Sequence, residues 1–71
     1  MKTFHGMEKA ARIQAQERAN RDQVPMHVYR FDHVAAIPGG WEATWYVRAA
    51  NEERPMFARF IVSIMPERVQ K

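Results

Sequence analysis

Apolar and polar residues alternate without interruption along residues 41–49, whose sequence is WEATWYVRA. The odd positions hold Trp, Ala, Trp, Val and Ala, whereas the even positions hold Glu, Thr, Tyr and Arg. Since successive side chains of a β-strand point to opposite faces, this pattern predicts a strand with one apolar face. The adjacent aromatic residues Trp45 and Tyr46 then face opposite sides, and Tyr46 is predicted to lie outside the core that holds Trp45.

Residues 26–34 and 56–65 are rich in aromatic and β-branched residues and are also predicted to be strands. The connections AAIPGG and ANEERP are short, which predicts an antiparallel meander. Residues 6–21 are mostly good helix formers, with Ala11, Ala15 and Ala19 at i+4 spacing. The sequence therefore predicts an α+β fold in one domain, residues 1–71, with an N-terminal helix packed on a three-stranded antiparallel β-meander (α-β-β-β).

The register of the strand predicted at residues 26–34 depends on where the carboxylate of Asp32 would lie. A two-residue turn at Pro38-Gly39 would place Asp32 opposite Trp45, which presses a charge against the core. A three-residue loop, Ile37 to Gly39, instead places Phe31 opposite Trp45, and we prefer it because a one-residue slip flips every side chain. The predicted core is then Tyr29, Phe31, Trp41, Trp45, Val47, Phe60, Val62 and Ile64.

The same register predicts an open sheet face on the side away from the helix. Arg30, Tyr46 and Arg59 would form a row across the strands, with a guanidinium on each side of the tyrosine ring. Tyrosine and arginine on an apolar background are typical of binding hot spots. The predicted partner-binding residues are Arg30, Tyr46, Arg48, Phe57, Arg59 and Ile61.

Composition bears on how the chain is stabilised, where it is expected to reside and how it is charged. A chain of 71 residues without cysteine has a small core and no disulfide to stabilise it, so a partner or a homodimer is an open alternative. No secretory signal and no apolar run long enough for a membrane span is visible, so we expect a cytoplasmic protein without membrane contact. The net charge of +3 is modest, and arginine supplies most of the basic residues.

Catalytic residues are scarce. The chain has no cysteine, and its one serine, Ser63, lies in the middle of a predicted strand. His27 and His33 are six residues apart, about 20 Å along a strand, so they cannot bind one metal ion together. The segment PGG is a turn and lacks the glycine spacing and following helix of a phosphate-binding loop. We therefore predict no enzyme, no cofactor and no metal.

The preferred hypothesis is a small binding protein that docks on a protein partner through the Tyr/Arg face. Phage or mobile-element proteins that modulate or inhibit host defence or transcription complexes are of this size and style. The alternative is a nucleic-acid-binding module that uses the basic and aromatic sheet face or the helix arginines. A helix followed by three antiparallel strands is similar in order to the first four elements of the double-stranded-RNA-binding fold, but no second long helix follows Pro66.

Overall fold

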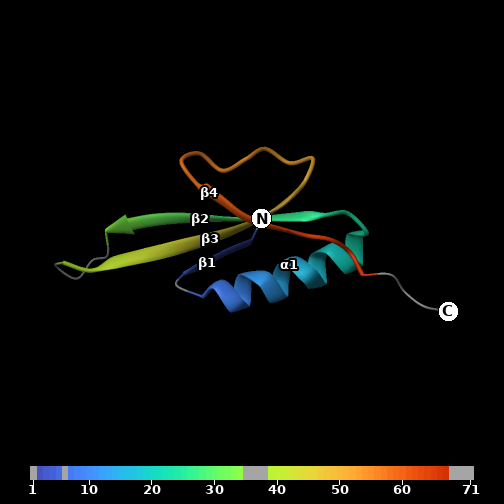
Figure 1. Cartoon of the computed structure of the whole chain (residues 1–71), viewed down its shortest axis with the longest axis horizontal. Helices are drawn as coiled ribbons and strands as arrows, with labels where there is room; N and C mark the ends of the chain where they lie inside the picture. The colour runs from blue at the N-terminus through green and yellow to red at the C-terminus, as the bar shows by residue number, and fades with distance from the viewer. Residues whose placement is uncertain (1, 6, 35–38, 68–71) are drawn as a thin grey trace.

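A computed structural model describes residues 2–5, 7–34 and 39–67 of the chain. The elements are β1 (Lys2–His5), α1 (Glu8–Asp22), β2 (Met26–Val34), β3 (Trp41–Ala49) and β4 (Arg59–Ile64). Strands β2, β3 and β4 are antiparallel and follow the helix, as Figure 1 shows. The predicted α+β class and the α-β-β-β order of these elements are therefore confirmed.

Helix α1 lies on one face of the sheet through its alanines. Ala11, Ala15 and Ala19 are all 0% exposed, which confirms the predicted stripe. Because alanine side chains are short, the helix axis can approach the sheet closely. The helix ends at Gln23, which adopts the left-handed conformation (φ 55°) and whose Nε2 donates to the carbonyl of Asn20 at 2.6 Å.

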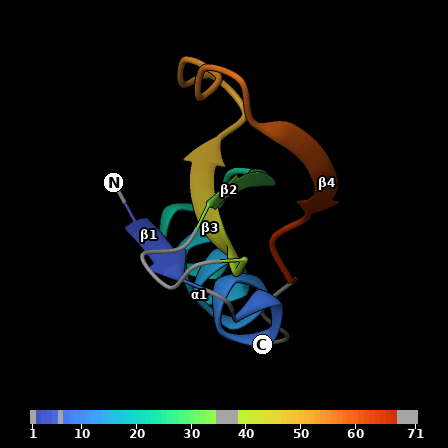
Figure 2. The same ribbon diagram turned by 90° about the vertical axis from the view of Figure 1, so that its left-hand side faces the viewer.

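The order of strands in the sheet is β1-β3-β2-β4, which corrects the predicted meander. β4 pairs with β2 and not with β3, so the connection between β3 and β4 crosses β2. Figures 1 and 2 show this connection, residues 50–58, on the side of the sheet opposite α1. β1 is an additional strand that the sequence did not predict, because four residues are too few to display a period.

The pairing of β2 with β3 corrects the predicted register by one residue. Arg30 lies opposite Trp45 and Val28 opposite Val47, so every β2 side chain faces the other way from the prediction. Asp32 does lie on the helix side, but it stays 44% exposed and accepts a bond from Arg30 Nε at 2.7 Å. The desolvation cost that decided the prediction therefore does not arise. The preferred loop, Ile37 to Gly39, lies largely outside the described residues.

The core forms between α1 and one face of the sheet. Met26, Val28 and Val47 are fully buried, and Trp45 is 3% exposed. Val62 and Ile64 pack against this cluster, as predicted. The other predicted core residues do not join it: Tyr29, Phe31 and Phe60 belong to the opposite face, and the Trp41 side chain lies outside the described residues.

A β-bulge interrupts the pairing of β2 with β4. Val28 pairs with Val62 and Tyr29 with Phe60, which leaves Ile61 as the extra residue, packed against the core. The molecule is elongated, 53 × 21 × 17 Å, because the β2–β3 hairpin extends past the outer strands (Figure 1). The 15-residue α1 is the one helix of the described residues, and it is neither long nor apolar enough to cross a membrane.

Candidate functional site

The predicted partner-binding residues are divided between different parts of the molecule. Arg30 lies on the helix side, with its guanidinium 5.5 Å from the Trp45 ring, and Ile61 packs against the core. The predicted row of Arg30, Tyr46 and Arg59 is therefore wrong. It assumed that β3 lies between β2 and β4, whereas β2 holds that place. Tyr46 and Arg48 do lie on the face away from the helix.

Tyr46 and Arg48 form one part of the site on β3. The Arg48 guanidinium lies 5.2 Å from the Tyr46 ring centre, and its Nη1 donates to the Val47 carbonyl at 3.2 Å. Arg48 is only 7% exposed, which is unusual for a charged side chain. These contacts hold its guanidinium in a defined orientation.

The crossing connection covers the middle of the sheet face that was predicted to be open. Arg54 lies over the Tyr29 ring at 5.7 Å, and its Nη2 donates to the Ala58 carbonyl at 3.2 Å. Tyr29 and Ala58 are consequently buried, at 6% and 4% exposure. His27 and Phe60 extend this layer, with ring centroids 5.5 Å apart. A second small cluster therefore forms on the side opposite α1.

The start of the connection is tied to the helix. Arg18 of α1 donates to Glu52 at 2.7 Å and to the Val47 carbonyl at 3.3 Å. Glu52 also accepts from the backbone N–H of Ala49. That bond, together with the charge of Arg18, holds the pKa of the Glu52 carboxyl below its ordinary value of 4.5. The connection is thus anchored near its start by Glu52, and the bond from Arg54 to Ala58 spans residues 55–57.

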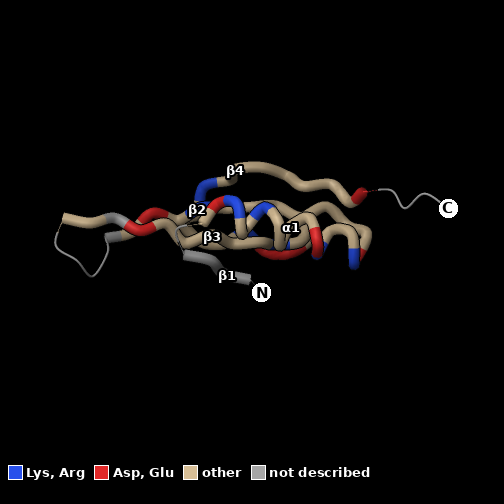
Figure 3. Tube along the Cα trace, turned by 90° about the horizontal axis from the view of Figure 1, so that it is seen from below, with Lys and Arg blue, Asp and Glu red and all other residues tan. Residues whose placement is uncertain are grey.

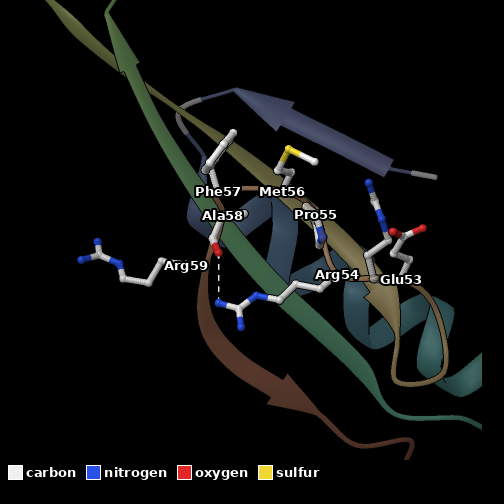
Figure 4. A pocket seen from close by; sticks show the side chains of 8 residues that line it. Glu53, Arg54, Pro55, Met56, Phe57, Ala58 and Arg59 are labelled. Carbon is white, nitrogen blue, oxygen red and sulfur yellow. Dashed lines mark hydrogen bonds between the residues drawn. The ribbon is translucent and has the colours of Figure 1, made fainter.

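The apex of the connection lies between the bonded residues Arg54 and Ala58 and carries two exposed apolar side chains. Met56 is 79% exposed and Phe57 is 85% exposed. Phe57 also has a φ of 63°, in the left-handed region that bulky L-residues rarely adopt. In Figure 4, Met56 and Phe57 project from the same side of the connection, whereas Arg54 runs back along it towards Ala58.

An open pocket of about 760 Å³ lies at this apex. It is lined by Arg48, by residues 53–58 and by Arg59 at the start of β4. Its lining carries three arginines and one glutamate, Glu53. Arg59 also approaches Asp32, with Nη2 3.9 Å from Oδ2, and its side chain is 69% exposed. The lining of the pocket therefore combines charged side chains with two exposed apolar ones, Met56 and Phe57.

Sequence reasoning missed Arg54 and Met56 as members of this site. Met56 was assigned to the start of the third strand and Arg54 to a short turn. No local signal separates these two starts, because Pro55 precedes the predicted strand 56–65 as it precedes β4. A strand starting at Arg59 leaves residues 50–58 as a connection long enough to cross β2.

The described residues offer little for catalysis. His33 Nε2 and Thr44 Oγ1 lie 2.8 Å apart near the far end of the hairpin, and Ser63 is exposed on the edge strand. No group of three His, Asp or Glu in the described part of the chain is placed to hold a metal ion. The chain matches no protein-family model, no curated protein and no solved structure.

Proposed function

We propose that this chain is a small non-enzymatic protein that docks on a protein partner through a loop patch. The loop patch comprises Tyr46, Arg48, Arg54, Met56 and Phe57. It retains three of the residues expected from the sequence on one surface, Tyr46, Arg48 and Phe57, and joins them to the apex of the β3–β4 connection.

The conformation and exposure of Phe57 carry this proposal. The left-handed conformation costs an ordinary L-residue about 1–2 kcal/mol. The ring recovers little of that within the monomer, because it is 85% exposed. A glycine or asparagine would close the same connection with less strain, so a strained and exposed phenylalanine favours a role outside the fold. Burying such a ring in a partner would contribute about 1.5–3 kcal/mol.

The surroundings of Phe57 also support binding. Glu52 holds the start of the connection and the bond from Arg54 to Ala58 closes the apex, so little order has to be gained on association. Aromatic residues, methionine and arginine are the residue types enriched at the centre of protein interfaces. A mobile, polar loop would have neither this order before binding nor these residue types.

The nucleic-acid alternative finds less support in the distribution of charge. Figure 3 shows acidic residues interspersed among the basic ones along α1. Arg12 pairs with Glu8 at 2.7 Å, and Arg21 pairs with Asp22 at 2.9 Å. Phosphate binding requires a basic surface whose charges are available to the backbone of the nucleic acid. Ion pairs of this kind favour a solvated helix surface instead.

Capture from a lysate of the cells that produce the protein would test the proposal. The wild type is compared with a Met56→Ser/Phe57→Ser double variant, and every capture is run with and without nuclease. The matched control is Met7→Ser/Met65→Ser, which removes two methionines that are 57% and 62% exposed elsewhere. We expect a protein that is retained after nuclease, lost with the apex variant and kept by the control.

Two results would contradict this proposal. Equal loss of the captured protein with the apex variant and with the control would indicate non-specific binding by exposed apolar residues and no defined patch. Loss of all capture after nuclease would favour the nucleic-acid alternative, and steep weakening of RNA binding with salt would support it further.

A further inference from the structure

The outer edge of β4 is unpaired within the described part of the chain. In the sheet order β1-β3-β2-β4, β4 pairs with β2 on one side, and no other strand of residues 2–5, 7–34 and 39–67 pairs with its other side. Figure 2 shows β4 at the outside of the sheet, away from β1 and β3. Along such an edge, about half of the backbone N–H and C=O groups point outward, where a further strand can pair with them.

The side chains along this edge lack the charges and the proline that usually keep an exposed strand from pairing. The six residues from Phe60 to Met65 read FIVSIM. Ile61, Val62 and Ile64 pack against the core and yet stay only half-buried. Phe60 and Met65 are 46% and 62% exposed. An uncharged, apolar edge of this kind favours strand pairing with another chain.

The two ends of the same edge carry opposite charges. Arg59 precedes the uncharged residues and Glu67 follows them. Both charged groups lie on the α1 side of the sheet, because Arg59 Nη2 approaches Asp32 Oδ2 to 3.9 Å and Glu67 Oε1 accepts from Asn20 of α1 at 2.9 Å. Arg59 and Glu67 are both exposed. An antiparallel strand of the same sequence would therefore bring opposite charges together at both ends, which makes this edge complementary to itself.

Symmetry restricts the register of such a pair. Directly opposite residues of antiparallel strands point to the same face, so a two-fold axis through the sheet pairs each residue with one an even number of positions away. With the axis at Ser63, Val62 lies opposite Ile64, and Arg59 lies opposite Glu67. This register matches apolar with apolar side chains in the middle and joins the opposite charges at the ends.

We propose that this chain forms a homodimer through antiparallel pairing of β4 with the β4 of a second copy. The two four-stranded sheets then form one continuous sheet with both α1 helices on the same face. The pairing satisfies the outward backbone groups of β4 and covers its half-buried side chains. It also enlarges the core of a small chain that has no disulfide. The loop patch contains none of the residues of this edge, so the inference is independent of the proposed docking function.

Sedimentation equilibrium of the full chain from about 5 to 500 µM tests for the dimer, and we expect the mass to rise from one chain to two. Ser63→Lys places two ammonium groups opposite each other at the axis and should weaken the dimer at least about tenfold. Asn51→Lys is the matched control, because it adds the same charge at an exposed residue outside β4. It should change the dissociation constant by less than about twofold. Circular dichroism checks that both variants are folded.

Mixed charge variants test the register. Arg59→Glu alone, or Glu67→Arg alone, makes both ends of the dimer repulsive, and each should weaken it about five- to tenfold. In an equimolar mixture of the two variants, opposite charges meet again at both ends, so the mixture should recover the affinity of the wild type. Recovery on mixing cannot come from a change within either chain, which separates pairing from effects on folding.

Three results would overturn the homodimer through β4. The first is a wild type that stays a monomer over the whole concentration range. The second is a mixture of the charge variants that associates no more tightly than each variant alone. The third is a dimer that Ser63→Lys leaves intact and Met56→Ser/Phe57→Ser abolishes, because the contact between the copies would then lie at the loop patch.

Discussion

Replacement of Phe57 by asparagine should stabilise the protein and weaken its binding at the same time. The backbone at this position has a φ of 63°. Asparagine adopts the left-handed region more readily than phenylalanine, because its short polar side chain can hydrogen-bond locally. The same change removes the exposed ring at the centre of the loop patch. Stability and binding should therefore move in opposite directions.

The size of the effect follows from strain and burial. Relief of the left-handed conformation is worth at most about 1–2 kcal/mol. The ring is 85% exposed, so asparagine gives up only about 15% of a side-chain area of about 200 Å², or about 30 Å². At about 25 cal/mol per Å², this loss is about 0.8 kcal/mol. The net change is a stabilisation of up to about 1 kcal/mol, which raises the Tm by about 4–8 °C at most for a domain of this size.

Thermal and urea unfolding of the purified variants measure this change. Met56→Asn is the control, because Met56 is 79% exposed but is not among the residues with positive φ. It should be neutral or mildly destabilising, since it relieves no strain. The difference between the two variants then isolates the contribution of the backbone conformation.

A Phe57→Asn variant that unfolds several degrees below the wild type would refute this reasoning. Its ring would then be contributing to the fold, and its exposure could not be attributed to a partner. An equal shift in the Tm of both variants would show that added polarity at the apex causes the effect and that relief of backbone strain does not.

The remaining predictions concern the core and the anchor of the connection. Val28→Ala should lower the free energy of unfolding by about 2–3 kcal/mol, because the substitution shortens a side chain that is fully buried. Urea unfolding measures this loss. A loss below about 0.5 kcal/mol would place Val28 outside the core. Ala15→Leu should lower the free energy of unfolding by about 1–3 kcal/mol, and with it the Tm, because Ala15 is fully buried between α1 and the sheet. Ile13→Leu is the control, and it should change the Tm little because Ile13 is 50% exposed. The Glu52 carboxyl has a lowered folded-state pKa, so its contribution to stability is complete above its ordinary value of 4.5 and is lost as the pH falls through the folded-state pKa. The stability difference between wild type and Glu52→Gln should therefore shrink from about pH 7 to about pH 3 in urea titrations, and a constant difference would contradict the assigned anchor.

The elements with a strong local period were predictable from the sequence. The alanine spacing of Ala11, Ala15 and Ala19 identified the buried face of α1, and all three are fully buried. The alternation in β3 separated Trp45 from Tyr46 correctly, since the period of two is a property of the strand itself. Both results depend only on backbone geometry within one element.

The register of β2 was not predictable in this way. Its two faces are both partly apolar, with Met26 and Val28 on one and Tyr29 and Phe31 on the other. The predicted register rests on the carboxylate of Asp32. A salt bridge from Arg30 and the position of Asp32 towards the end of the sheet removed that cost, and neither is visible as a period along the chain.

By itself, the sequence determined the class of the fold, the buried stripe of its helix and the inward side of β3, because each follows from side-chain spacing within one element. Only the tertiary structure decided that β4 pairs with β2 and that residues 50–58 consequently cross the sheet. That crossing buries Tyr29 under Arg54 and brings Arg48, Arg54 and Phe57 to one surface. These contacts join residues of different elements, and the pairing of strands that unites them is decided by the free energy of the whole sheet and by no local pattern.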